Sequence, residues 1–411
     1  MRILVLHQYY LEENDAGGSR WNEMTKFWSD QECEITVLAG MIHANGNEKL
    51  PEYKGKWFKR KKQGKVEVIR CHVSESYNLH FLGRLWGYFS FMFSSLYAGV
   101  FLAKGKYDVI IVTSPPLFVG MSGYIISLFK KCAFLFEIRD LWPESAIDTG
   151  VVKNKWIIKL AFSFERFIYK KAKLINVLTP AFQKKLIEEK KISKEKIIFI
   201  PNAADFTISD ELLTNFDACL FRKKLGIEDR FVITYVGAHG VANHLEQILD
   251  AAIYLKDTNV LFLLIGQGME KERLKRYSQE KRITNVMFLD PVPKKEVFKY
   301  ILASDIGTSV LKNVETFKTV YSNKTFDYLA CKKPILMAID GISRQLIEEA
   351  KAGVFVEPEN PKDFSDKIKL LLENQDEIKK MGENGYSFAK KNFDRIELAK
   401  KYLDEIKKMN K

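Results

Sequence analysis

The sequence lacks the motifs through which many enzymes hold a metal ion or a dinucleotide. No Asp-x-Asp occurs in its 411 residues, which argues against a diphosphate site bridged by a metal between paired aspartates. The six histidines show no HExxH or similar ligand spacing. A Walker-type GxxxxGK[ST] loop is absent, and the Gly-x-Gly at 266–268 has no third glycine at the dinucleotide spacing. We therefore expect no metal centre and no cofactor, nicotinamide included.

Cysteine is also scarce, and its arrangement argues against a disulfide framework. The five cysteines are odd in number, scattered and without Cys-x-x-Cys spacing, which indicates free thiols in a reducing compartment. No signal peptide is evident, because the opening apolar run MRILVLHQYY is too short for one and fits a first β-strand. These features favour a cytoplasmic location.

Acidic residues are too few in the first half of the chain to balance the basic ones. Residues 1–200 carry 31 Lys and Arg against 20 Asp and Glu, whereas residues 201–411 carry 34 against 32. Most of the net charge of +13 therefore belongs to the first half. It predicts an acidic partner there: a nucleic acid, an anionic lipid or a phosphorylated substrate.

Short apolar segments rich in Ile and Val alternate with helical patterns along the whole chain, as in doubly wound α/β proteins. The alternation breaks at Pro201-Asn202, so we predict two similar α/β domains, 1–201 and 202–392, with an amphipathic helix at 393–411. The predicted strands of the first domain are 2–10, 33–40, 66–73, 107–114, 132–140, 173–179 and 196–202. Those of the second are 231–237, 260–268, 286–293, 305–311, 334–339 and 353–359.

Ligands of open α/β sheets bind beyond the carboxyl ends of the strands, so the segments that follow the strands are the candidate sites. After the first strand, Gly17 and Gly18 allow close approach of a ligand, and a helix beginning near Ser19 could hold a phosphate with help from Arg20. The alternative is a glycine turn with a surface arginine.

The stretch LFEIRDLWPES, residues 135–145, places four charged groups just after a strand: Glu137, Arg139, Asp140 and Glu144. Arg139, Asp140 and Glu144 could take part in acid/base chemistry or in binding an acceptor. A salt-bridged turn with Trp142 as a packing anchor explains the same residues equally well.

The stretch YVGAHGVANHLEQILDAA, residues 235–252, forms a loop between a strand and a helix, where α/β proteins often hold a phosphate. It contains no Lys or Arg, so Gly237, His239 and Gly240 are its candidate ligands. A structural role for His239 fits the same pattern.

In residues 314–338 a helix is expected from about Asn323, with Lys318 and Lys324 near its N-terminus and Asp327 one turn inside. The lysines and free helix N–H groups could hold a diphosphate, and Asp327 could accept hydrogen bonds from a ribose. An ordinary capped helix with solvated lysines is the alternative.

A basic and aromatic region lies in the first half. KGKWFKRKKQGK, residues 54–65, holds seven basic residues, and residues 85–103 downstream carry no charge. A membrane-spanning helix, a buried crossover helix and a helix partly buried and partly facing a membrane all fit. The basic run beside it favours the last, as a peripheral contact of residues 54–103 with an anionic bilayer. No RRM, KH or helix-turn-helix signature supports nucleic-acid binding.

Taken in order, several motifs resemble the GT-B retaining glycosyltransferases of the family 4 type, most closely bacterial N-acetyl-L-fucosamine transferases of the WbuB kind. The motifs are GGSR, IRDLWPES, IPNAAD, YVGAHGVANHLEQILDAA, LIGQGME and SNKTFDYLACKKPIL. The resemblance implies two Rossmann-like domains facing a central cleft, a nucleotide-sugar donor on the second domain and an acceptor on the first. It also implies no metal requirement and a last helix that returns to the first domain.

The chain departs from the broader family at several positions. The Arg and the Lys-Gly pair of the donor loop are replaced by Ala238 and by Asn243-His244, and the catalytic His position holds Arg139. The family's two glutamates fall on Thr319 and Asp327. The donor-binding residues implied are Gly17, Gly18, Arg20, Gly237, His239, Gly240, Gly266, Gly268, Lys318, Lys324 and Asp327, with Arg139, Asp140, His239 and Lys324 as catalytic candidates and Asp140 and Glu144 contacting the acceptor.

We therefore expect a metal-independent retaining glycosyltransferase. It would move an N-acetylated (deoxy)hexosamine from a UDP-sugar to a polyprenyl-diphosphate-linked sugar at the inner face of the cell membrane, for O-antigen or capsule synthesis. The replaced donor-loop residues leave a second possibility, a catalytically silent GT-B protein that binds lipid-linked glycan beside a true transferase. A GT-B sugar-nucleotide epimerase is a weaker third reading, and a nucleic-acid binder a distant fourth.

Overall fold

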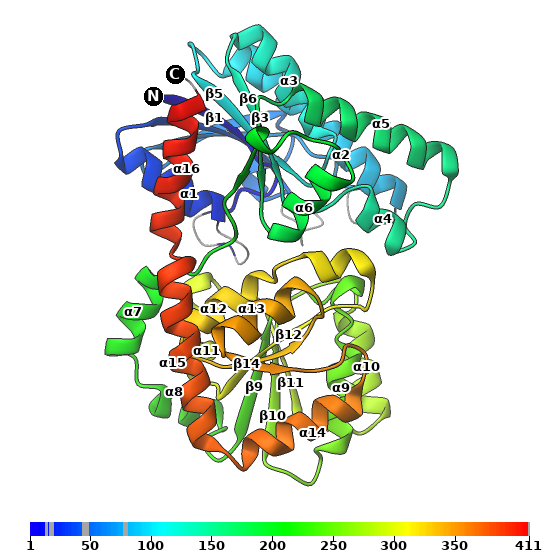
Figure 1. The fold of residues 1–411 in the computed structure, drawn as a ribbon, viewed down its shortest axis with the longest axis vertical. Helices are drawn as coiled ribbons and strands as arrows, with labels where there is room; N and C mark the ends of the chain where they lie inside the picture. Colours follow the sequence, from blue (N-terminus) through cyan, green and yellow to red (C-terminus); the bar gives the residue numbers. More distant parts are fainter. Residues whose placement is uncertain (13–14, 16–19, 43–48, 77–80, 410–411) are drawn as a thin grey trace. The chain divides into compact units, whose positions relative to one another are not determined.

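The structure is a computed structural model that describes residues 1–12, 15, 20–42, 49–76 and 81–409. Two compact units make up the chain. Of the described residues, those within 1–12, 20–201 and 396–409 belong to unit 1, and residues 202–395 form the body of unit 2. Both are Rossmann-like doubly wound α/β units, so the predicted fold class is confirmed (Figure 1).

Unit 1 is built on an eight-stranded sheet in the order β3-β4-β2-β1-β5-β6-β7-β8, in which only the β3–β4 pair is antiparallel. The central strands are buried along nearly their whole length, which explains their continuous Ile and Val content. The strands are β1 (Arg2–Leu6), β2 (Glu34–Gly40), β3 (Phe58–Gln63), β4 (Val66–Cys71), β5 (Val109–Ser114), β6 (Ala133–Ile138), β7 (Leu174–Val177) and β8 (Ile197–Phe199).

Helices cover both faces of this sheet (Figure 1). One face carries α2, α3 and α5, and the other carries α1 and α16. The helices of unit 1 are α1 (Arg20–Asp30), α2 (Phe81–Tyr97), α3 (Val119–Lys130), α4 (Glu144–Asp148), α5 (Lys155–Lys171), α6 (Pro180–Glu188) and α16 (Arg395–Met409). A π-helical turn, Ala98–Leu102, extends α2.

The strand β3 was not among the predicted strands. Its sequence FKRKKQ has four basic residues in six and little apolar content. It nevertheless pairs with β4 as the edge strand of the sheet, where lysines prevent pairing with another chain. The basic run at 54–65 is therefore partly an edge strand.

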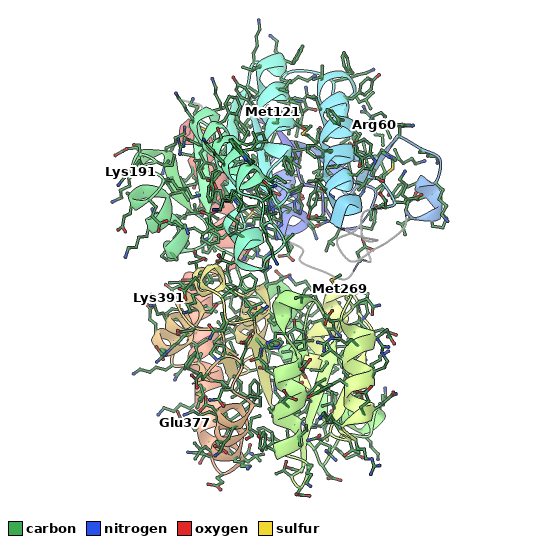
Figure 2. The ribbon with its side chains drawn as sticks, turned by 90° about the vertical axis from the view of Figure 1, so that its right-hand side faces the viewer. Arg60, Met121, Lys191, Met269, Glu377 and Lys391 are labelled. Atoms are coloured by element: carbon green, nitrogen blue, oxygen red, sulfur yellow. The ribbon has the colours of Figure 1, made fainter. Side chains whose placement is uncertain are left out.

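The apolar segment Leu85–Leu102 is one helical stretch, long and apolar enough to cross a membrane by length and composition. About a third of it is buried, 33%. It connects β4 to β5, which lie in the same sheet, and Ser122 of α3 donates a hydrogen bond to the Met92 carbonyl of α2 at 2.7 Å. Figure 2 shows α2 and α3 side by side, with Met121 on α3. The helix is therefore a crossover helix with one buried and one exposed face.

Unit 2 is built on a six-stranded parallel sheet in the order β11-β10-β9-β12-β13-β14. Its strands are β9 (Phe231–Val236), β10 (Val260–Ile265), β11 (Val286–Leu289), β12 (Ile306–Val310), β13 (Ile335–Ala338) and β14 (Gly353–Phe355). Its helices are α7 (Phe206–Asn215), α8 (Ala218–Leu225), α9 (Glu246–Tyr254), α10 (Lys271–Glu280), α11 (Lys294–Leu302), α12 (Asn323–Ala330), α13 (Ile342–Ala350), α14 (Pro361–Leu372) and α15 (Gln375–Asn392).

The last helix, α16, completes the core of unit 1. Trp28 of α1 is fully buried, and its indole Nε1 donates a hydrogen bond to the Ala399 carbonyl at 2.8 Å. The Trp28 ring meets the Tyr402 ring edge-on, with centroids 5.5 Å apart, and Trp21 lies 6.1 Å from the same ring. Residues from the two ends of the chain thus form one aromatic cluster.

We expect Trp28→Ala to lower the free energy of unfolding of unit 1 by about 3–5 kcal/mol, because it leaves a large cavity and removes the hydrogen bond to α16. Trp156→Ala is the matched control, since this tryptophan is 79% exposed, and it should change stability by less than about 0.5 kcal/mol. Denaturant unfolding measures both. Equal stability losses in the two variants would contradict the role of Trp28.

Candidate functional site

In unit 2, the loops that follow β9 and β10 pack backbone to backbone. The His239 N–H donates to the Gln267 carbonyl at 3.0 Å, and the Glu270 N–H donates to the His239 carbonyl at 2.9 Å. A Cβ on Gly266 would lie 1.8 Å from the Gly237 carbonyl oxygen, and one on Gly268 would lie 2.4 Å from that of His239. Glycine at 266 and 268 is therefore required by the packing of the two loops, whether or not a ligand is bound.

Gly237 and Gly240 have different surroundings. Gly237 has φ +148°, and a Cβ there would lie 3.0 Å from Cε of Lys324. A Cβ on Gly240 would meet only Oδ1 of Asn243, at 3.6 Å. Gly237 thus leaves room for the Lys324 side chain, and the backbone at Gly240 is open. A cavity of about 100 Å³ lies beside Gly240, lined also by Arg273 and Lys312.

The side chain of His239 is enclosed in unit 2. Its ring is fully buried between Tyr235 and Phe288, with centroid distances of 6.1 and 6.2 Å. Burial lowers its pKa to about 4, assisted by the charges of Lys271 and Lys275, so the ring is neutral near pH 7. Contact between His239 and a ligand above the loop would therefore run through its backbone and not through a cationic ring.

Lys324 is the half-buried cation of this site. It stands at the start of α12, half-buried, with Nζ 3.3 Å from Oγ of Ser322 and 4.7 Å from the centroid of the Tyr235 ring. Among the residues that the structure describes, no carboxylate lies within ion-pair distance of it. Burial lowers the pKa of Lys324 to about 8, and the charge of Asp327 raises it in part. An anion bound here would supply the missing counter-charge.

The helix α12 adds donors at the same place. Its N-cap residue, Ser322, makes no side-chain capping hydrogen bond to the first turn. The first N–H groups of a helix have no partner within the helix and carry partial positive charge. Lys324 and the start of α12 could therefore bind one anion together, near the end of β9.

The two other candidates near α12 differ from Lys324. Lys318 lies on the short 3₁₀ turn Glu315–Thr319 and forms an ion pair with Glu315 at 2.6 Å. Its charge is therefore already balanced. Asp327 lies one turn after Lys324 on α12, half-buried, where it could accept hydrogen bonds from hydroxyl groups.

Lys271 was not among the predicted site residues. This lysine is only 2% exposed, and its Nζ donates to the carbonyls of Gly266 and Leu289 at 2.8 and 2.9 Å and pairs with Asp290 at 2.7 Å. It thereby holds together the loops that follow β10 and β11. Its position as the first residue of the strongly amphipathic α10 looks, in sequence, like that of a solvated charge.

In unit 1, the loop between β6 and α4 is a network of paired charges. Ser145 donates to the Asp140 carboxylate at 2.9 Å, and burial raises the pKa of Asp140. Glu144 pairs with Lys190 at 2.7 Å, and Lys190 also pairs with Glu165 of α5 at 2.5 Å. Arg139 is half-buried beside Asp140. The alternative of a salt-bridged turn therefore describes Glu144 well, while Asp140 remains a candidate acceptor contact.

Arg20 is buried in unit 1 and already engaged. It is 3% exposed, its Nη2 pairs with the fully buried Glu137 at 3.1 Å, and it donates to the carbonyls of Ile200, at 2.9 Å, and Pro201. Glu137 also accepts from Trp21 and Asn176, at 3.1 and 2.8 Å. The expected contact of Arg20 with a diphosphate finds no support in this geometry. Gly17 and Gly18 lie outside the described residues.

His7 lies at the carboxyl edge of the sheet in unit 1 but was not among the predicted site residues. It follows β1 directly, is fully buried, and its Nδ1 lies 2.6 Å from Oγ1 of Thr113 at the end of β5. Burial lowers its pKa well below the usual value, assisted by the charges of Arg139, Arg70 and Arg20. Its place after the first strand was the available signal.

Comparison with known proteins places both units in named families. Residues 16–203 match the model described as "Glycosyl transferase 4-like domain", and residues 219–388 match "Glycosyl transferases group 1". The chain is 25% identical to the putative colanic acid biosynthesis glycosyl transferase WcaI of Escherichia coli K12 over 292 residues, covering 70% of this chain and 71% of WcaI. It is 23% identical to the putative teichuronic acid biosynthesis glycosyltransferase TuaH of Bacillus subtilis, covering 62% of each chain.

Solved structures with the same fold include Anabaena HepE in complex with UDP and glucose, with a TM-score of 0.71 and 16% identity over 99% of this chain and 100% of that one. WaaG, a glycosyltransferase involved in lipopolysaccharide biosynthesis, has a TM-score of 0.70 and 15% identity over 99% of each chain. Because the sequence identities are this low, these two structures show that the chain has the same fold and nothing about its substrates.

We expect Arg20→Ala to lower the free energy of unfolding by about 3–5 kcal/mol, because it leaves the Glu137 carboxylate buried without its cation. Adding Glu137→Gln should recover part of that loss, since the uncompensated charge is then gone. Arg166→Ala, at an exposed position of α5, is the control. An Arg20→Ala variant that unfolds at the wild-type denaturant concentration would refute the structural role.

Proposed function

The chain is a glycosyltransferase of the GT-B fold, with a glycosyl transferase 4-like N-terminal half and a group 1 C-terminal half, and we propose that it uses a UDP-sugar as donor. The proposed acceptor is a polyprenyl-diphosphate-linked sugar in the synthesis of a bacterial surface polysaccharide, such as an O-antigen or a capsule. The transferred group is an N-acetylated (deoxy)hexosamine such as N-acetyl-L-fucosamine, moved with retention and without a metal. The enzyme works at the inner face of the cell membrane, with residues 54–103 towards the bilayer.

One observation carries the proposal: Lys324, a half-buried cation with no carboxylate within ion-pair distance among the described residues, stands at the start of α12. When the donor bond breaks, negative charge develops on the leaving diphosphate. A fixed cation and helix N–H groups stabilise that charge without reorganising. Asp327, one turn further, would hold the ribose hydroxyls. The UDP complexes of HepE and the colanic and teichuronic acid names of the relatives fit the same donor class and pathway type.

A catalytically silent binding protein is the second candidate function. Ala238 and Asn243 replace the cations of the family's donor loop, and Arg20 is engaged inside unit 1. In the transferase, by contrast, Lys324 would be the principal cation for the donor diphosphate. Binding of nucleotide sugars separates the two candidates, because a silent protein without a donor site would bind none.

The proposed function is tested by adding a panel of UDP-, GDP- and dTDP-sugars and measuring binding by calorimetry and slow donor hydrolysis by product release. We expect UDP-sugars to bind and at least one N-acetylated UDP-sugar to be hydrolysed slowly. Lys324→Met should weaken UDP binding by about tenfold or more, because it removes the cation that faces the diphosphate. Lys318→Met is the matched control, since Lys318 is paired with Glu315. Absence of binding by every donor would overturn the proposal.

The affinity for UDP should depend on pH through Lys324. Its pKa is lowered to about 8 in the free protein, and a bound diphosphate would raise that pKa, so UDP binding is coupled to proton uptake. With a UDP-sugar, whose diphosphate diester does not titrate in this range, the dissociation constant should be nearly constant from pH 6.5 to 7.5. Above pH 8 it should rise, approaching about tenfold per pH unit. Lys324→Met should abolish this rise, and a rise retained in the variant would assign it to another group.

A further inference from the structure

The segment from Val151 to Leu160, at the start of α5, exposes a cluster of large apolar side chains. Trp156 is 79% exposed and Leu160 71%, and Ile157 is exposed too. No other large apolar side chain among the described residues is more exposed than these first two. Apolar side chains this exposed, grouped on one turn, indicate a contact surface.

The segment is held in a fixed conformation. The Asn154 side chain accepts hydrogen bonds from the N–H groups of Trp156 and Ile157, at 2.9 and 3.3 Å, and so caps α5. On the opposite face, Ala161, Glu165, Ile168 and Tyr169 are buried in unit 1. Trp156 and Leu160 are therefore presented on the outer side of a formed, anchored helix.

Basic side chains surround the apolar ones. Lys153, Lys155 and Lys159 are all exposed, and Nζ of Lys159 lies 5.9 Å from the centroid of the Trp156 ring. Residues 149–164 contain no Asp or Glu, and the carboxylate of Glu165 is turned inward to Lys190. The neighbouring α2 and α3, on the same face of the sheet, also contain no Asp or Glu (Figure 1).

We propose that residues 151–160 form a second membrane-docking element, separate from residues 54–103, which inserts Trp156, Ile157 and Leu160 into the interface of an anionic bilayer. Tryptophan, aliphatic side chains and lysines on one turn match the apolar boundary and anionic headgroups of such a bilayer. A second copy of the chain fits poorly, because a two-fold contact would bring two sets of the three lysines together without any carboxylate.

Residues 151–160 are joined to the loop between β6 and α4, the acceptor loop, which carries the candidate acceptor contact Asp140. The Val152 N–H donates to the Ala146 carbonyl at 3.0 Å, so the turn before α5 folds back on α4. Lys190 links Glu165 of α5 to Glu144 at the start of α4. Bilayer docking through this element would hold the acceptor loop close to the membrane, and in this respect the inference rests on the proposed lipid-linked acceptor.

The test is sedimentation of the full-length protein with lipid vesicles, either of phosphatidylcholine alone or with about one-third phosphatidylglycerol. Trp156→Ser/Leu160→Ser should weaken binding to the anionic vesicles by about tenfold or more. Lys153→Gln/Lys155→Gln/Lys159→Gln should weaken it by about tenfold to a hundredfold. The matched controls in unit 2, which should bind as wild type, are Tyr254→Ser/Leu370→Ser and Lys369→Gln/Lys379→Gln/Lys380→Gln, all at exposed positions.

Calorimetry with UDP on the same proteins distinguishes a failure of this inference from a failure of the proposed function. Unchanged UDP binding with lost vesicle binding supports the docking element. Wild-type vesicle binding by both unit 1 variants, or equal binding of the wild type to both kinds of vesicle, overturns it. Sedimentation velocity without lipid shows whether the protein forms a dimer. If the wild type is a dimer and Trp156→Ser/Leu160→Ser is a monomer, the surface is a contact between copies, and the inference is overturned. Absence of UDP binding in the wild type would count against the proposed function alone.

Discussion

The buried carboxylate of Glu137 organises the carboxyl edge of the sheet in unit 1. Arg20 comes from the first helix, Trp21 from the next position, and Asn176 from β7, and all three donate to this one group. Arg20 also reaches the carbonyls at the end of the unit, next to the boundary between Pro201 and Asn202. A charge buried in this way is tolerated only when every partner is in place. The network therefore fixes α1, β6 and β7 against one another before any ligand is bound.

Two lysines of unit 2, the buried Lys271 and the half-buried Lys324, differ in the partners of their ammonium groups. Lys271 is satisfied by two carbonyls and a carboxylate, so it serves the packing of the loops after β10 and β11. Among the described residues, a hydroxyl and an aromatic face lie near the ammonium group of Lys324, and burial lowers its pKa. The contrast separates a lysine with a structural role from one that has no carboxylate within ion-pair distance among the described residues. In the proposed donor site, the loop around His239 would contribute backbone groups, while Lys324 and the N–H groups of α12 would contribute positive charge.

Sequence reasoning recovered the alternation of strands and helices, because buried parallel strands leave continuous apolar runs. It also recovered Lys324 as a cation at a helix start, since that depends on local order. It could not identify Lys271, because the carbonyls that surround this lysine come from Gly266 and Leu289, in separate loops. It could not show that Arg20 is buried, because Glu137 lies far along the chain. The edge strand β3 was missed because its lysines hide the strand pattern.

The aromatic cluster of Trp21, Trp28 and Tyr402 has a consequence for the order in which the protein can be made. Unit 1 begins at the first residue, yet it includes residues 396–411. During synthesis on the ribosome, α1 cannot bury its tryptophans against α16 until the end of the chain has been made, and all of unit 2 is synthesised in between. Unit 2, the later half of the chain, can thus complete its core first, while two tryptophans of the earlier half stay uncovered. A nascent or truncated chain that ends before residue 396 would present that apolar surface to chaperones.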